Sequence, residues 1–253
     1  MNPRSLAPHP FAQYSLAVSP LFAILAFSTL MFSTARAELI NGIDFPQGAL
    51  SFADEVVNFS PGPGPAAAFL EPLNALGVPD VNTTNGLACF TAPSTANCKF
   101  TSLGDSGSLT VRFTDNFLSG SSPSGTKIGT GDGFNDLYIV EVGVAESTSV
   151  EISADGSNWF NAGNIGGGGG NSIGVFNYGF DIDKLGFGFT DLFTYVRLVD
   201  LQIDPGTSPQ GADIDGIGAI QTVVPAPASL PLAITALGAL MLRSRRRLNL
   251  KAS

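Results

Sequence analysis

Short apolar runs with a period of two constrain the fold of this chain more than any other feature. Alternating apolar residues are typical of strands that bury one face, and Gly, Asn, Asp, Ser and Pro clusters between them are typical of turns. No long amphipathic helix is evident between residues 38 and 224. We therefore predict an all-β domain, an antiparallel β-sandwich of the jelly-roll type. The predicted strands lie at residues 108–114, 136–143, 149–153, 193–201 and 214–220.

The N-terminal segment is typical of a secretory signal peptide. Arg4 precedes a mostly apolar run at residues 16–32, and Ala35-Arg36-Ala37 follows that run. A basic start, an apolar middle and a small-x-small end indicate export, with cleavage after Ala37. An uncleaved membrane anchor is the alternative. We assign residues 1–37 to the signal peptide and residues 38–224 to an exported domain.

The C-terminal segment, residues 225–253, is typical of a single transmembrane helix with a basic end. The 20 residues from Val223 to Leu242 are mostly apolar, which is roughly the ~20 needed to cross the hydrocarbon of a bilayer. A cluster of basic residues follows and should stay in the cytoplasm. A buried core helix or a permanent anchor would be the alternative. The basic cluster consists of Arg243, Arg245, Arg246 and Arg247.

A short motif before this helix gives a more specific interpretation. The residues Val224, Pro225, Ala226 and Pro227, the apolar helix and the arginine cluster together resemble the PEP-CTERM sorting signal. Ala226 stands where that family usually has Glu. The resemblance implies processing by the membrane protease-transpeptidase exosortase, with removal of a helix that anchors the chain only transiently in the inner membrane. It also implies a Gram-negative-type bacterium that makes exopolysaccharide.

Charge and histidine content exclude several classes of function. Residues 38–224 contain all 21 acidic residues and only five basic ones, so their net charge is −16. An acidic surface repels phosphate backbones, and we therefore exclude nucleic acid as a partner. The sole histidine, His9, lies in the predicted signal peptide. The exported domain therefore cannot use a Ser-His-Asp mechanism or a His-ligated zinc site.

Cys89 and Cys98 are the only cysteines, and both lie in the predicted exported domain. Paired cysteines in an oxidising compartment usually form a disulfide. The pair lacks the C-x-x-C spacing of redox and metal sites, so we predict a structural disulfide.

Three acidic segments are candidates for calcium ligands, at residues 53–57, 131–136 and 211–216. Carboxylates at short spacing, with glycines that permit tight turns, suit the six to eight oxygen ligands of Ca²⁺. Ordinary turn residues are the alternative. Asp213 and Asp215 form the best pair, because residues i and i+2 of a strand share a face. The candidate ligands are Asp54, Asp132, Asp136, Asp213 and Asp215.

A hairpin signal at residues 153–159, Ser-Ala-Asp-Gly-Ser-Asn-Trp, and the closing run at residues 212–215 resemble a galactose-binding-like (discoidin-like) jelly roll. The resemblance implies that the first and last strands lie close together. It also implies a structural calcium where the two ends meet, bound by Asp54 with Asp213 or Asp215. Trp159, the only tryptophan, would either fill the core or stack on a sugar.

Two functions from different classes are consistent with these features. The first is a noncatalytic protein of the cell surface or extracellular matrix, whose sandwich binds polysaccharide or another surface protein. The second is an exported glycan hydrolase that uses a pair of carboxyl groups. We favour the first, because the predicted domain is small and shows no insertion that would form a cleft. The identity of the ligand is not encoded in any recognisable motif.

Overall fold

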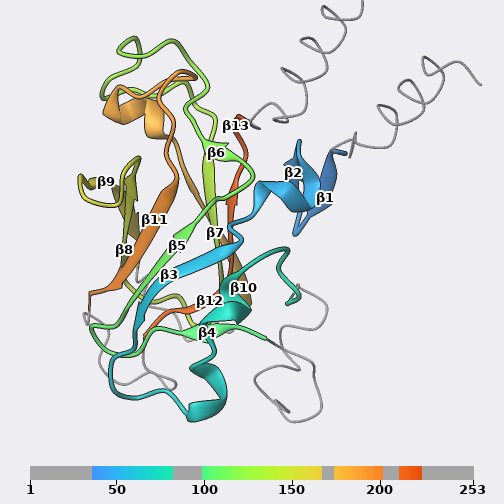
Figure 1. Cartoon of the computed structure of the whole chain (residues 1–253), viewed down its shortest axis with the longest axis vertical. Coiled ribbons are helices and arrows are strands. Elements are labelled where there is room, and N and C mark those ends of the chain that lie inside the picture. The colour runs from blue at the N-terminus through green and yellow to red at the C-terminus, as the bar shows by residue number, and fades with distance from the viewer. Residues whose placement is uncertain (1–35, 82–98, 167–173, 202–210, 224–253) are drawn as a thin grey trace, which may run out of the picture. The chain divides into compact units, whose positions relative to one another are not determined.

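The computed structural model describes residues 36–81, 99–166, 174–201 and 211–223 (Figure 1). All of them belong to one compact unit, Ala35–Ser253. Within these ranges the secondary structure consists of strands and short 3-10 helices. The predicted class, an all-β antiparallel sandwich, is confirmed.

Two antiparallel sheets form the sandwich. The four-stranded sheet has the order β10-β7-β12-β4, and the five-stranded sheet has the order β3-β5-β11-β8-β9. The first sheet consists of β10 (Gly174–Phe180), β7 (Leu137–Gly143), β12 (Asp213–Ala219) and β4 (Thr101–Ser102). The second consists of β3 (Glu55–Ser60), β5 (Ser108–Arg112), β11 (Tyr195–Asp200), β8 (Thr148–Ser153) and β9 (Phe160–Ile165).

Smaller elements complete the described fold. Two further pairs of strands are β1 (Glu38–Ile40) with β2 (Ile43–Phe45), and β6 (Phe117–Leu118) with β13 (Thr222–Val223). The 3-10 helices are η1 (Gly48–Ser51), η2 (Ala67–Phe69), η3 (Pro72–Ala75) and η4 (Ile182–Leu185).

The main core lies between the two sheets, as the period-two pattern requires. In β11, Val196 and Leu198 are fully buried. The residues on either side of each, Tyr195, Arg197 and Val199, are only partly buried. Ile139 of β7 and Ile217 of β12, which are paired across the opposite sheet, belong to the same hydrophobic cluster. The two inner faces therefore share one core.

The five strands predicted from the sequence are confirmed as β5, β7, β8, β11 and β12, with ends that differ by a few residues. The Asp155-Gly156 hairpin is also confirmed, because β8 pairs with β9 across it. Phe52, just before β3, forms a bridge with Gly218 of β12, so the expected closeness of the first and last strands is confirmed.

Strand β12 is buried on both faces, and alternating isoleucine and glycine explain how. Ile217 faces the main core, and Gly218 lies under the rings of Phe45 and Phe52, whose centroids are 4.6 Å apart. A Cβ atom at Gly218 would lie 2.6 Å from Phe45 and 2.9 Å from Phe52. Glycine at position 218 therefore lets the N-terminal segment pack against the outer face of β12. Every residue of β12 is buried as a result.

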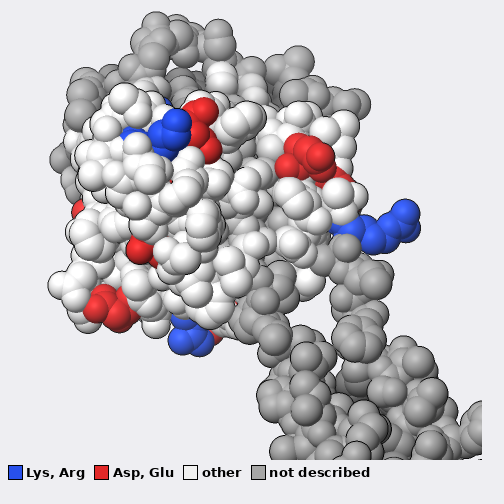
Figure 2. Space-filling view, turned by 90° about the horizontal axis from the view of Figure 1, so that it is seen from above, with Lys and Arg blue, Asp and Glu red and all other residues white. Residues whose placement is uncertain are grey.

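Not all of the acidic residues lie at the surface. Eight of the 20 acidic residues that the structure describes are buried. Neutral residues predominate on the face shown in Figure 2, and its acidic groups are separated from one another. The buried acids are Asp136, Glu141, Glu146, Asp181, Asp183, Asp200, Asp213 and Asp215.

Several predicted features lie outside the described residues. They are the signal peptide with Ala35, the Cys89–Cys98 disulfide and the sorting signal from Val224 onward. Within the described ranges, no helix has the length and apolar character needed to cross a membrane.

Replacing Gly218 with alanine should destabilise the protein. The added methyl group would overlap the Phe45 and Phe52 rings, and overpacking of this kind costs about 1–3 kcal/mol. Urea denaturation should show a lower midpoint for Gly218→Ala. Gly166→Ala is the matched control, because its Cβ would meet no atom within 4 Å. Equal midpoints for the two variants would contradict the proposed packing of β12.

Candidate functional site

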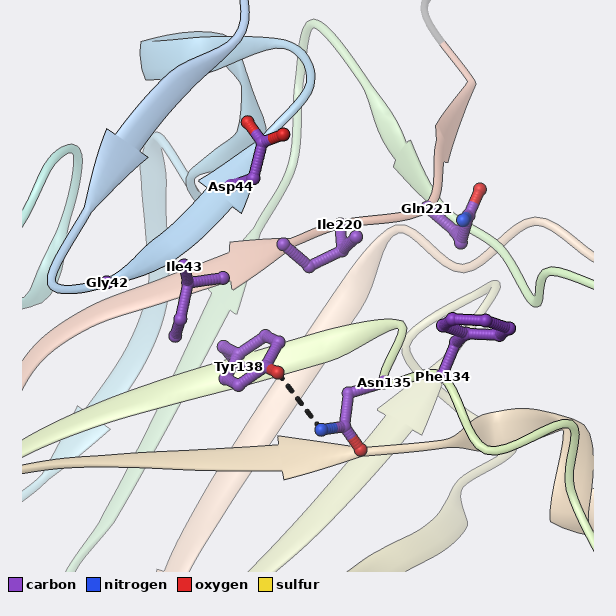
Figure 3. Close-up of a pocket in the computed structure, with 8 residues that line it drawn as sticks. All are labelled: Gly42, Ile43, Asp44, Phe134, Asn135, Tyr138, Ile220 and Gln221. Carbon is purple, nitrogen blue, oxygen red and sulfur yellow. Dashed lines mark hydrogen bonds between the residues drawn. The ribbon is translucent and has the colours of Figure 1, made fainter.

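A hollow of about 300 Å³ lies beside the β1–β2 hairpin and is the first feature of the candidate site (Figure 3). The hairpin forms one end of it, and the segments that precede β7 and follow β12 form the other. Its described lining residues are Gly42, Ile43, Asp44, Phe134, Asn135, Tyr138, Ile220 and Gln221.

The hairpin side of the hollow is built by local turn chemistry and by packing. Asn41 and Gly42 both have positive φ angles, as a tight two-residue hairpin turn requires. Ile43, Tyr138 and Ile220 all pack against a small hydrophobic cluster of Ile40, Phe45 and Phe52. Asn177 of β10 donates a hydrogen bond of 3.0 Å to the carbonyl oxygen of Asn41. These contacts fix the hairpin against the outer face of the four-stranded sheet.

The opposite side of the hollow combines an exposed ring with polar side chains. The Phe134 ring is 69% exposed, although it lies between buried segments. Asn135 Nδ2 donates a hydrogen bond of 3.0 Å to Tyr138 Oη. Any side chain at Gly179 of β10 would overlap Asn135, so glycine there makes room for the amide. The hollow therefore offers an aromatic face together with amide, hydroxyl and carboxylate groups.

An acidic cluster is the second feature, and it lies next to Phe134 in the sequence. Asp132, Asp181 and Asp183 each present an oxygen within 4.8 Å of the others. Asp132 comes from the loop between β6 and β7, whereas Asp181 and Asp183 lie at the start of η4. This is the one such group of three or more potential ligands among the described residues.

Glycine and serine residues of the β6–β7 loop form the surroundings of this cluster. Gly131 has a φ of 66°, and the Asp181 carboxylate occupies the space that a side chain there would fill. Asp183 accepts hydrogen bonds of 3.0 Å from the N–H groups of Ser121 and Ser122. Asp132 Oδ1 accepts the Phe134 N–H at 2.9 Å, which connects the cluster to the hollow.

A fourth acid, Asp136, lies at the edge of the cluster. It is fully buried at the start of β7, and Asp136 Oδ2 accepts the Ile182 N–H at 2.9 Å. Burial raises the pKa of Asp136 to about 7, the Ile182 hydrogen bond lowers it, and the charge of Asp183 raises it further. Its backbone also connects three strands, because its N–H donates to Phe180 and its carbonyl oxygen accepts from Ile220.

The structure therefore brings together two of the predicted calcium ligands, Asp132 and Asp136, but it does not join them to the other three. Asp54 accepts hydrogen bonds from the backbone N–H and the hydroxyl of Thr114. The side chains of Asp54, Asp213 and Asp215 do not form a metal-binding group within the described residues. Calcium binding by Asp54 with Asp213 or Asp215, where the two ends meet, stays a prediction.

A β-bulge separates the environments of Asp213 and Asp215. The register with β7 shifts between Ile214 and Gly216, so Asp215 is an extra residue in the strand. Asp215 Oδ2 accepts the Val81 N–H at 3.0 Å, whereas Asp213 pairs with Ser102 of β4. The simple i, i+2 rule does not apply across a bulge. Both side chains are buried, so neither lies on a solvent-facing strand surface.

Sequence reasoning missed Asp181, Asp183 and Ser121. Two aspartates separated by one residue directly after an aromatic strand, as in Phe180-Asp181-Ile182-Asp183, resemble the segments that were singled out. The signal was therefore present at η4. The closeness of this segment to residues 121–136, however, depends on tertiary structure and cannot be read from spacing.

A second group of buried acids surrounds Glu141 in the four-stranded sheet. Glu141 is fully buried, its Oε1 accepts the Glu146 N–H at 2.9 Å, and its Oε2 has no partner among the described residues. Burial raises the pKa of Glu141 to about 9, and the charges of Glu146 and Asp213 contribute. Burial likewise raises the pKa of Asp213 well above its usual value. All three acids of this group, Glu141, Glu146 and Asp213, are buried in the described structure.

Trp159 does not fill the core, and Arg197 lies over one face of its ring. It is half-buried, and the Arg197 guanidinium lies 4.1 Å above the centroid of its ring. Arg197 also forms an ion pair with Glu151, its cross-strand neighbour, at 2.5 Å. The cation–π contact covers one face of the indole.

Comparisons with known proteins do not establish a family. The sequence matches no protein-family model and no curated protein. One similar structure is CpGH89CBM32-4 of Clostridium perfringens, in complex with glcNAc-alpha-1,4-galactose. Its TM-score is 0.38 at 10% identity, over 69% of this chain and 93% of that one. Another is the C-terminal domain of a Bacteroides fragilis chitobiase, with a TM-score of 0.27 at 14% identity, over 47% and 65%. Similarity at this level indicates nothing about ligand or activity.

Replacing Glu141 with glutamine should stabilise the protein at neutral and alkaline pH. The folded state holds a proton on Glu141 up to about pH 9, whereas the unfolded state releases it near the ordinary value of 4.5. Between those values the folded state binds more protons, so the wild-type free energy of unfolding falls as pH rises, by up to about 1.4 kcal/mol per unit. Urea denaturation from pH 5 to 9 should show a shallower fall for Glu141→Gln.

The exposed variant Glu38→Gln serves as the control and should follow the wild-type profile. The glutamine amide oxygen can still accept the Glu146 N–H, so the hydrogen bond at position 141 is preserved. Parallel pH profiles for wild type and Glu141→Gln would show that this carboxyl group is not the buried acid described.

Proposed function

We propose that this chain is a noncatalytic exported protein of the cell surface or extracellular matrix, whose β-sandwich, of the galactose-binding-like type, binds polysaccharide in the hollow beside Phe134. One observation carries the proposal: a 69% exposed aromatic ring stands at a hollow lined by amide and carboxylate side chains. Another surface protein is the alternative partner.

The lining suits the two kinds of surface that a sugar ring presents. An aromatic ring packs against the C–H face of a sugar, where it removes apolar area from water. The amides of Asn135 and Gln221 can donate hydrogen bonds to hydroxyl groups and accept them, and the carboxylate of Asp44 can accept them. A concave site with few polar groups at fixed positions is typical of small-ligand recognition.

The same lining favours binding over cleavage. Glycoside hydrolysis by the usual route needs two carboxyl groups on opposite sides of the scissile bond. Asp44 is the single acid among the described lining residues. The hydrolase alternative would therefore need a second carboxyl group from elsewhere, and a release assay on polysaccharide substrates distinguishes the two functions.

Export and processing belong to this proposal as well. The N-terminal segment that ends at Ala37 supports export, and the resemblance to the PEP-CTERM signal supports sorting by exosortase. The predicted cleavage after Ala37 would leave β1, which begins at Glu38, intact. Intact-mass measurement of the protein from its native envelope tests the processing.

Replacing Phe134 with alanine should weaken glycan binding by about 1–2 kcal/mol, roughly tenfold, because the stacking surface is lost. A glycan array identifies the best ligand of the wild-type protein, and calorimetry compares the variants on that ligand. Phe189→Ala is the matched control, because Phe189 is 53% exposed and does not line the hollow.

The control should bind as the wild type does. Equal affinity for wild type and Phe134→Ala would place the binding surface elsewhere on the sandwich. Failure of the wild-type protein to bind any glycan on the array would favour the protein partner.

A further inference from the structure

The hydroxyl group of Ser121 lies among more acceptors than it can satisfy. Ser121 Oγ is 2.7 Å from Asp132 Oδ2 and 2.9 Å from Asp183 Oδ2. A serine hydroxyl donates one hydrogen bond at a time. At least one of these short oxygen–oxygen contacts therefore lacks a hydrogen between its atoms.

Two buried carboxylate oxygens in the same place have no partner. Asp136 Oδ1 and Asp181 Oδ1 are both inaccessible and form no hydrogen bond within the described part of the chain. The two residues are 0% and 6% exposed. A buried acceptor that lacks a donor costs free energy, and for a charged group the cost is larger. Asp136 is not one of the three clustered acids, so its free oxygen is independent evidence for a missing positive partner.

Positive charge from the protein does not balance these four acids. Among the described residues, the base nearest to an oxygen of this cluster is Lys184, whose Nζ is 3.9 Å from Asp181 Oδ2. The lysine side chain is 55% exposed, so solvent screens its charge. Four carboxyl groups next to one half-exposed ammonium group retain a strong excess of negative charge.

We propose that Asp132, Asp181 and Asp183, with Asp136 beside them, bind a divalent cation, and that this cation is calcium. All the ligands available are hard oxygens from carboxylates and serine hydroxyls, and Ca²⁺ accepts six to eight oxygens in a flexible arrangement. Mg²⁺ requires near-ideal octahedral geometry, which four carboxylates from two loops do not readily provide. Gly131 and Gly133, both with positive φ angles, let the loop fold closely around Asp181.

The cation would join segments that are far apart in the sequence. Asp132 and Asp136 enclose Phe134 and Asn135, whereas Asp181 and Asp183 lie about 50 residues further on, after β10. The proposed cation site does not depend on glycan binding in the hollow. Its test contains no glycan, so failure of the cation site and failure of the glycan site give different results.

Asp181→Asn is the sharpest test variant. Its amide oxygen can still accept the Gly133 N–H, which Asp181 Oδ2 now accepts at 3.3 Å, and its NH₂ group takes the position of the unpartnered oxygen. In EGTA this variant should melt at or above the wild-type temperature, because one repelling charge is gone. In CaCl₂ the wild-type melting temperature should rise by several degrees. Calorimetry with CaCl₂ should show affinity reduced about tenfold or more in the variant.

Asp105→Asn, in the turn between β4 and β5 and outside the cluster, removes the same charge and should bind calcium as the wild type does. Three results would overturn the proposal. The first is a wild-type melting temperature that is equal in EGTA and CaCl₂. The second is unchanged calcium affinity in Asp181→Asn. The third is an equal or larger rise with the same concentration of MgCl₂, which would reject calcium as the ion.

Discussion

The burial of β12 on both faces is the constraint on which the rest of the structure depends. Its isoleucines complete the core between the sheets, and Gly218 leaves room for Phe45 and Phe52 on the outer face. The N-terminal hairpin is thereby attached to β12, although some 170 residues separate the two in sequence. Without that attachment, one side of the hollow beside Phe134 would not exist.

The distribution of carboxyl groups follows from this compact arrangement. A domain with 21 acids and five bases would be expected to expose its acids, yet eight of those described are buried. The fold accommodates these buried acids in two ways. Around Glu141 the acids hold protons, as the raised pKa values indicate. Around Ser121 the acids accept backbone N–H groups and retain free oxygens, the arrangement for which we infer a cation.

Sequence alone predicted the β-sandwich and its five most regular strands, because a period of two over buried apolar residues is a local signal. The β1–β2 hairpin was missed, although Asn41-Gly42 is a strong hairpin turn. Strand β10 was missed because glycine and asparagine interrupt its apolar pattern, and β9 was predicted only as the second strand of the Asp155-Gly156 hairpin. Among site residues, Asp132 and Asp136 were predicted. Asp181 and Asp183 were not joined to them, since only the fold brings the end of β10 to this loop.

The loop at residues 131–136 connects the two sites, because Asp132 accepts the Phe134 N–H and because Phe134 and Asn135, which line the hollow, lie between Asp132 and Asp136. Hydrogen exchange of the purified protein in CaCl₂ and in EGTA tests this connection most directly. In CaCl₂, amide hydrogens in peptides that cover residues 121–136 and 181–186 should exchange more slowly than in EGTA. Exchange in the β8–β9 hairpin should be the same in both buffers. Identical exchange in the two buffers throughout residues 121–136 would contradict this connection.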